Sequence, residues 1–159
     1  PLDRKELTQR HRDLCLEAFG PLHPRPGVMN SIDEARQLWI PIALASSSEQ
    51  SWVMKHLTRF DIAELFHSIR TADDVEKVKP DPELYQLTLT TMGVKPHRAL
   101  AFEDSPNGIK AAKAAGLYCV AVPNPVTRQM PLGEADRQID SMADISLREL
   151  LHQIEMSRK

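Results

Sequence analysis

The sequence has 159 residues, of which 42% are hydrophobic and 26% charged, and its 20 basic and 22 acidic side chains leave a formal net charge of −2. This is the composition of a soluble globular domain that can bury one core, and it gives no electrostatic reason to expect nucleic acid or an anionic membrane as a partner. The two cysteines, Cys15 and Cys119, lie in unlike contexts, so neither a disulfide framework nor a zinc site is predicted, and a reducing cytoplasm fits best.

In chain order, the pattern begins with a helix and a hinge. Residues 1–20 carry a few apolar side chains among many charges and end in a glycine, which predicts an amphipathic helix. Residues 21–27 hold three prolines and a glycine and are predicted to form a linker or hinge. From residue 28 onward, short apolar runs alternate with stretches of helical periodicity. This alternation predicts an α/β fold with a parallel sheet and helices on both of its faces.

The bounds of the individual elements follow from apolar spacing and from stop signals such as Gly93 and Gly116. The predicted helices cover residues 31–38, 49–57, 82–92, 106–115 and 147–156. The predicted strands cover residues 40–45, 67–71, 100–103, 118–122 and, as a short edge strand, 138–140.

The stretch that points to chemistry is the apolar run at residues 100–102, which ends in the acid pair Glu103 and Asp104. Ser105 is a candidate N-cap and Pro106 the first residue of the next helix, so the acids lie at the carboxyl end of a strand, where open α/β sheets bind ligands. Two adjacent carboxylates repel unless they share a positive charge, most simply a hard divalent cation. The alternative is that they only favour the positive end of the helix dipole.

A second stretch ends in hydroxyl groups at a comparable position. The run at residues 40–45 is followed by Ser46, Ser47 and Ser48. We expect Ser47 and Ser48 mainly to cap the following helix, although the backbone N–H of Ser47 can also point at a phosphate.

A third stretch, Lys79-Pro80-Asp81-Pro82, places a lysine before a proline that excludes helix at that lysine. Lys77 is the other candidate for a functional lysine, and the proline favours Lys79. The order of hydroxyl, lysine and acid pair resembles the haloacid dehalogenase superfamily of phosphotransferases. The resemblance is strongest to the branch that contains β-phosphoglucomutases and small phosphate-ester phosphatases, and it covers residues 25 to about 125.

The resemblance implies a role for each of these side chains. Ser46, with Ser47, would bind a phosphoryl oxygen, and Lys79 would neutralise charge on the nucleophile and on the transferring phosphoryl group. Asp104 with Glu103 would hold a magnesium ion. These roles suit phosphoryl transfer, which needs mainly positioning and charge neutralisation.

The resemblance also implies a domain layout. Residues 1–20 would be the last helix of a helical cap, residues 21–27 the hinge, and residues 28–159 a Rossmann-like core without its first strand. The family's nucleophile is the first aspartate of an Asp-x-Asp pair on the central strand, and no Asp-x-Asp occurs in this sequence. A sheet without that strand would leave two rows of backbone groups unpaired, at a cost of roughly 1–3 kcal/mol for each unsatisfied group.

We therefore expect this sequence to be the C-terminal portion of a longer protein. Direct pairing of the strand before Ser46 with the strand that carries the acid pair would contradict that expectation.

The function implied is a magnesium-dependent phosphatase or phosphomutase that acts on a small phosphorylated metabolite such as a sugar phosphate, through an aspartyl-phosphate on an upstream residue. We expect a monomer or weak homodimer, with no nucleic-acid or membrane partner. A second possibility is a catalytically inactive relative that binds metal or phosphate without turnover. A third is a receiver-like signalling domain, which fits less well because its acids precede the hydroxyl and the lysine in the chain.

Overall fold

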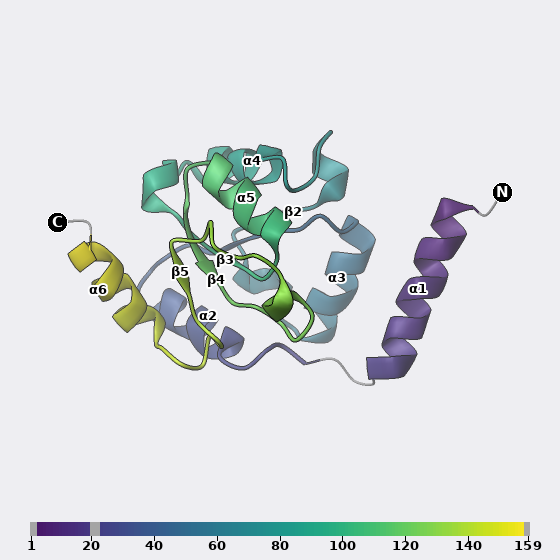
Figure 1. Cartoon of the computed structure of the whole chain (residues 1–159), viewed down its shortest axis with the longest axis horizontal. Coiled ribbons are helices and arrows are strands. Elements are labelled where there is room, and N and C mark those ends of the chain that lie inside the picture. Colours follow the sequence, from purple (N-terminus) through teal and green to yellow (C-terminus); the bar gives the residue numbers. More distant parts are fainter. Residues whose placement is uncertain (1–2, 20–22, 158–159) are drawn as a thin grey trace.

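The computed structural model describes residues 3–19 and 23–157 and confirms the alternation of strands and helices (Figure 1). Each helix and strand predicted from residue 28 onward is present, with ends shifted by a few residues. The helices are α1 (Arg4–Phe19), α2 (Val28–Gln37), α3 (Gln50–Arg59), α4 (Glu83–Met92), α5 (Pro106–Ala114) and α6 (Leu147–Ser157). The strands are β1 (Ala43–Ala45), β2 (Ser68–Arg70), β3 (Leu100–Glu103), β4 (Tyr118–Ala121) and β5 (Arg137–Gln138).

In the part of the chain that the structure describes, all strand pairs are parallel, and they form two sheets. Strands β1 and β2 make one sheet, with Leu44 opposite Ile69, and β3, β4 and β5 make the other. In Figure 1, helices α4 and α5 lie on one side of the strands and α2 and α6 on the other. The fold is therefore the α/β arrangement that the sequence predicts, with helices on both faces.

Strand β4 shows how the sequence builds these two layers. Successive side chains of a strand point to opposite faces of the sheet. Cys119 and Ala121 accordingly pack in one buried cluster with residues of α4 and α5, while Val120 packs in another with Leu150 and Ile154 of α6. The strand is apolar on both faces because both faces are covered.

A cleft of about 1800 Å³ lies between the two sheets, and its lining includes β1 and β3. In a parallel ladder, alternate residues direct their backbone N–H and C=O groups to opposite sides. The bond from Ser46 N to Arg70 O shows that the backbone of Ser46, and by alternation that of Leu44, faces β2. The bond from Val122 N to Glu103 O shows that the backbone of Glu103, and by alternation that of Ala101, faces β4. The amides of Ala43 and Phe102 therefore face the cleft. Within the residues that the structure describes, β1 and β3 do not pair, so the pairing that would contradict the expectation of a further strand is not observed.

Helix α1 lies beside α3 (Figure 1), and Arg12 is a point of contact between the two. Arg12 donates to the Glu49 carboxylate at 2.9 Å, and its guanidinium lies 5.0 Å from the centre of the Trp52 ring. Leu7 and Leu14 of the same helix are exposed. None of the helices in the described part of the chain has both the length and the apolar character needed to cross a bilayer.

The predicted hinge, residues 21–27, is described from residue 23 onward and is held against the end of β4. Arg25 donates to the carbonyl oxygens of Val122 and Pro123, each at 2.7 Å. Gly27 follows with a left-handed φ of 84°, and a Cβ atom built on it would lie 2.2 Å from the backbone of Met142. Only glycine combines that backbone conformation with so close an approach.

Replacing Gly27 with alanine should lower the free energy of unfolding by at least about 2 kcal/mol, because left-handed backbone strain and overpacking add together. Gly93→Ala is the matched control, since Gly93 also has a left-handed φ, 63°, but no atom lies within 4 Å of an added Cβ. Urea unfolding of both variants measures the difference. Equal losses would show that the close approach at Gly27 contributes nothing.

Asp136 joins α5 to β4. Its carboxylate accepts hydrogen bonds from Lys113 Nζ at 2.6 Å and from the backbone N–H of Cys119 at 2.7 Å. Burial alone raises the pKa of Asp136, but the Lys113 and Cys119 bonds outweigh it and lower this pKa below its ordinary value of 3.8. A depressed folded-state pKa stabilises the fold above the ordinary value, and that contribution disappears as the pH falls through the folded-state pKa.

We expect Asp136→Asn to cost about 1 kcal/mol of stability at neutral pH and progressively less below about pH 4, where the wild-type carboxylate also loses its charge. Asp140→Asn is the control, because Asp140 is 70% exposed and its 3.0 Å pair with Arg128 lies in solvent. Thermal unfolding of both variants between pH 7 and pH 2 checks this expectation. A cost that stays constant over that range would contradict it.

Candidate functional site

The polar groups singled out in the sequence gather at the carboxyl ends of β1 and β3. Ser46 directly follows β1, and Asp104 directly follows β3. Since the strands of each sheet are parallel to one another, each sheet presents these ends along one edge. Ser46, Lys79, Glu103 and Asp104 all line the cleft between the two sheets.

Lys79 connects the two edges of the cleft. Its ammonium group donates to the carbonyl oxygen of Ala45 at 2.9 Å, at the end of β1, and to Glu103 Oε1 at 2.5 Å, at the end of β3. The side chains of Lys79 and Glu103 are only 12% and 7% exposed, so this ion pair is largely shielded from solvent. Lys77 is exposed, whereas Lys79 lines the cleft.

The acids of the surrounding loop hold Lys79 in place through backbone bonds. The carboxylate of Glu83 accepts from the N–H groups of Glu76 at 3.1 Å and of Lys77 at 2.9 Å. Asp81 Oδ1 accepts from Glu83 N at 3.1 Å, at the start of α4. The acidic residues that follow Lys79 in the sequence thus stabilise the loop that places the Lys79 side chain in the cleft.

The two acids of the pair have different hydrogen-bond partners. The carboxylate of Glu103 is buried and accepts from Lys79 and from the hydroxyl group of Tyr85. Asp104 is half-buried and accepts from Asn124 Nδ2 at 2.9 Å. Glu103 is thus the counter-ion of Lys79, and Asp104 is the more accessible acid.

Asn124 has a larger part in the site than the turn role that its position after β4 indicates. Its Oδ1 accepts from the N–H groups of Val126 at 2.8 Å and Thr127 at 2.9 Å, which is the turn role. Its amide nitrogen meanwhile donates to Asp104. The signal available in the sequence was its place at the end of a strand adjacent to the acid-pair strand.

The carboxylate oxygens of Asp104 and Glu103 are the kind of ligand that a hard cation binds. Carboxylate oxygens are the protein ligands that Mg²⁺ prefers, and Mg²⁺ commonly uses one or two of them together with water and phosphate oxygens. Asp104 and Glu103 can supply that number, although Glu103 Oε1 already accepts two hydrogen bonds. In the described ranges, no three His, Cys, Asp or Glu side chains are grouped so that they could hold a metal ion.

The serines after β1 form a turn and not a helix cap. Ser46 Oγ accepts from Ser48 N at 3.1 Å, and Ser47 is exposed. The predicted capping role of Ser47 and Ser48 is wrong, because the N-cap of α3 is Glu49, without a side-chain bond. Asp73 caps the helix instead and accepts from Gln50 N at 2.8 Å.

The helix after the acid pair starts as predicted. Ser105 Oγ accepts from the N–H of Gly108 at 3.2 Å, with Pro106 as the first helical residue. Gly108 also lies against the site, since a Cβ atom built on it would be 1.8 Å from Glu103 Oε2. The sequence places this glycine inside the helix predicted for residues 106–115, and the contact with Glu103 became visible only in the structure.

Burial also controls the other titratable groups beside Glu103. Desolvation and the nearby Glu103 charge raise the pKa of the Tyr85 hydroxyl above its ordinary range. The same two effects raise the pKa of the Cys119 thiol to about 12. Both groups therefore stay protonated at neutral pH, and Cys119 is an inert side chain of the core.

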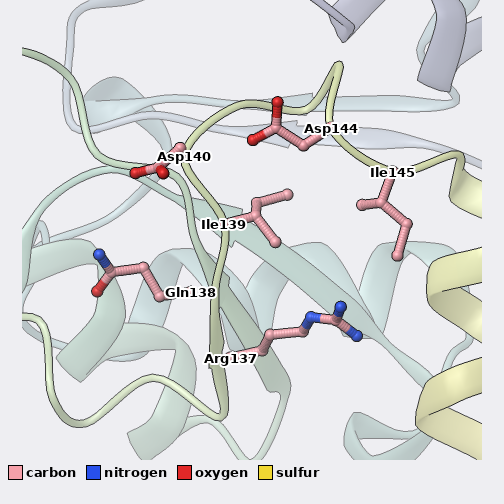
Figure 2. A pocket seen from close by; sticks show the side chains of 6 residues that line it. All are labelled: Arg137, Gln138, Ile139, Asp140, Asp144 and Ile145. Atoms are coloured by element: carbon pink, nitrogen blue, oxygen red, sulfur yellow. The ribbon is translucent and has the colours of Figure 1, made fainter.

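A separate depression of about 360 Å³ lies beside β5 and is lined by residues 137–140, 144 and 145 (Figure 2). Its charged groups already have partners within the protein. Arg137 donates to Gln153 at 2.6 Å, Asp140 accepts from Arg128 at 3.0 Å, and Asp144 accepts from the N–H of Ser141 at 2.8 Å. These bonds stabilise the loop before α6 and leave the cleft as the candidate site.

Comparison with known proteins finds a matching family and several relatives of this chain. Residues 3–122 match the family described as haloacid dehalogenase-like hydrolase. YhcW of Bacillus subtilis is 45% identical over 150 residues, which are 94% of this chain and 68% of YhcW. Hexitol phosphatase B of Escherichia coli is 32% identical over 150 residues, 93% of this chain and 68% of that enzyme. The crystal structure of CbbY from Rhodobacter sphaeroides in complex with phosphate superposes with a TM-score of 0.83 at 35% identity, over 94% of this chain and 69% of CbbY. The chain thus spans about two thirds of the length of each of these proteins.

Proposed function

The chain belongs to the haloacid dehalogenase-like hydrolase family, and we propose that it carries the phosphate-binding and metal-binding part of a magnesium-dependent phosphatase or phosphomutase. The substrate class is a small phosphorylated metabolite, such as a sugar phosphate. The observation that carries this proposal is the ammonium group of Lys79, which joins the ends of β1 and β3 beside Ser46 and Asp104.

The phosphoryl group is held by Ser46, Ser47 and Lys79 in this proposal. Ser46 Oγ accepts a bond from Ser48 N, which leaves its hydroxyl proton to be donated to a phosphoryl oxygen. The backbone N–H of Ser47 is a second donor. Lys79 supplies a positive charge in a largely dry position, where electrostatic stabilisation of a charged transition state is strongest.

Asp104 and Glu103 would hold the magnesium ion. When bound, the ion would polarise the phosphoryl oxygens and neutralise the charge that develops on them. Asn124 orients the Asp104 carboxylate from the neighbouring strand end. Lys79 keeps the Glu103 carboxylate at the same edge of the sheet.

We further propose that a parallel strand from outside this sequence lies between β1 and β3 and ends in the aspartate that attacks phosphorus. The cleft between the sheets and the amides that face it support this part of the proposal. The aspartate would displace the metabolite's hydroxyl oxygen from phosphorus and so form an aspartyl-phosphate. Water or a second hydroxyl group would then take the phosphoryl group and release the aspartate. On this layout, α1 is the last helix of a cap, residues 21–27 are the hinge, and the protein is a cytoplasmic monomer or weak homodimer.

The alternative is a relative that binds phosphate or metal without turnover, and an Asp-x-Asp pair on the strand proposed from outside this sequence is what distinguishes the enzyme from it. Membership of a hydrolase family makes a receiver-like signalling domain the weakest of the three possibilities.

Release of inorganic phosphate from a panel of sugar and polyol phosphates, with magnesium and then with a chelator, separates the first two possibilities. The enzyme proposal expects release that stops on chelation and returns with magnesium. Binding of phosphate without release, by the protein with its complete sheet, would establish the inactive relative instead.

A further inference from the structure

Tyr85 is a buried group of the site that the sequence did not single out. It lies in the first turn of α4, six positions after Lys79, and is only 8% exposed. Its ring packs in the cluster that contains Leu89, Ala101 and Ile109. A phenol hydroxyl buried in such a cluster needs a hydrogen-bond partner.

The partner of this hydroxyl is the counter-ion of Lys79. Tyr85 donates to Glu103 Oε1, the same oxygen that accepts from Lys79. Lys79 Nζ also lies 3.5 Å from the Tyr85 hydroxyl and 4.7 Å from the centre of its ring. An ammonium group has three hydrogens, and Ala45 O, Glu103 and Tyr85 are three acceptors for them.

This arrangement restricts the Glu103 carboxylate from two directions. Lys79 approaches it from the loop before α4, and Tyr85 approaches it from α4 itself. On the far side, Gly108 lies against Oε2, and a Cβ atom built on Gly108 would be 1.8 Å from that oxygen. Without the Tyr85 hydroxyl, the Glu103 carboxylate would keep its ion pair with Lys79. It would lose the second hydrogen-bond donor, which restricts rotation of the carboxylate group.

We propose that the Tyr85 hydroxyl is a positioning group that holds Glu103, and through Glu103 the Lys79 ammonium, in the geometry required for phosphoryl transfer. This inference rests on the proposed function. Tyr85 does not touch substrate in this scheme and acts through the two charged residues.

Tyr85→Phe tests the hydroxyl while keeping the ring in the core. Thr88→Val is the matched control, since Thr88 lies one turn later on α4, is 8% exposed, and donates only to the Leu84 carbonyl of its own helix at 2.7 Å. Both substitutions remove one buried hydroxyl from α4. Only Tyr85→Phe removes a bond to a charged group, which is the stronger kind.

The first measurement is steady-state phosphate release by the full protein. Tyr85→Phe should lower kcat by roughly tenfold and leave KM within about twofold, because the loss falls on positioning at the reacting group. Thr88→Val should leave kcat unchanged. Equal losses of kcat in the two variants would assign the effect to general destabilisation and overturn the inference.

The second measurement does not depend on turnover. The rate of reductive methylation at Lys79, followed by peptide mass spectrometry, reports how firmly its amino group is held, and the exposed Lys77 is an internal reference. Tyr85→Phe should raise the Lys79 rate relative to Lys77 by about threefold or more, because one restraint is lost. An unchanged ratio together with an unchanged kcat would overturn the inference.

The two measurements also separate this inference from the function on which it rests. If the wild-type protein releases no phosphate from any substrate but Tyr85→Phe raises the Lys79 labelling rate, the proposed function fails and the positioning of Lys79 stands. If the wild-type protein releases phosphate but the variant matches it in both measurements, the positioning role fails and the function stands.

Discussion

Replacing Lys79 with alanine should lower magnesium-dependent phosphate release by about a hundredfold or more, because a preorganised charge in a dry site stabilises the transition state strongly. The side chain is 12% exposed and bridges the ends of β1 and β3 through its bonds to Ala45 O and Glu103 Oε1. Lys77→Ala is the matched control, since Lys77 lies two positions away and is exposed. The measurement is kcat/KM for phosphate release by the protein with its complete sheet.

Asp104→Asn belongs to the same prediction. The amide keeps the shape of the carboxylate but removes the negative charge proposed to hold magnesium, so we expect a loss of similar size and a higher magnesium concentration at half-maximal rate. Near-normal rates in both Lys79→Ala and Asp104→Asn, with phosphate release still dependent on magnesium, would reject the roles assigned to these two residues.

Gly108→Ala should be strongly destabilising, although alanine is ordinarily the better residue inside a helix. A Cβ atom at this position would lie 1.8 Å from Glu103 Oε2, so the buried carboxylate would have to move. That movement would break the bonds from Lys79 and Tyr85 and leave a buried charge without its partner. Loss of one member of a buried ion pair costs about 3–5 kcal/mol.

Gly133→Ala is the matched control for that variant, because no atom lies within 4 Å of a Cβ added there. Thermal and urea unfolding give the two free energies. A Gly108→Ala protein within about 0.5 kcal/mol of the wild type, the range of ordinary surface substitutions, would show that Glu103 can move without cost. In that case the close packing of Gly108 against Glu103 would not be what holds this carboxylate in position.

The cluster formed by Lys79, Tyr85 and Glu103 connects stability and proposed function in one place. The same contacts that join the loop before α4 to β3 also hold the charge that phosphoryl transfer needs. We therefore expect variants of this cluster to change both unfolding and turnover. Lys77→Ala and Gly133→Ala should change neither.

The positions of the helices and strands were determined by the sequence, because capping and stop signals act within a few residues. Ser105 caps α5 three residues before its donor, and Gly93 ends α4 in a left-handed conformation. The order of Ser46, Lys79 and the acid pair was also sufficient to indicate the family, which the match over residues 3–122 confirms.

Only the tertiary structure decided which partner each side chain meets, because those partners lie far away in the chain. Asp73 caps α3 from 23 residues downstream, which is why the nearer Ser47 and Ser48 were wrongly expected to do so. Lys79 meets Glu103 across 24 residues. Tyr85 and Gly108 belong to the site only because packing of α4 and α5 on the sheet brings them to the same carboxylate. The local spacing of residues therefore predicts helices and strands, whereas the partners of a buried charged group depend on how those helices and strands pack together.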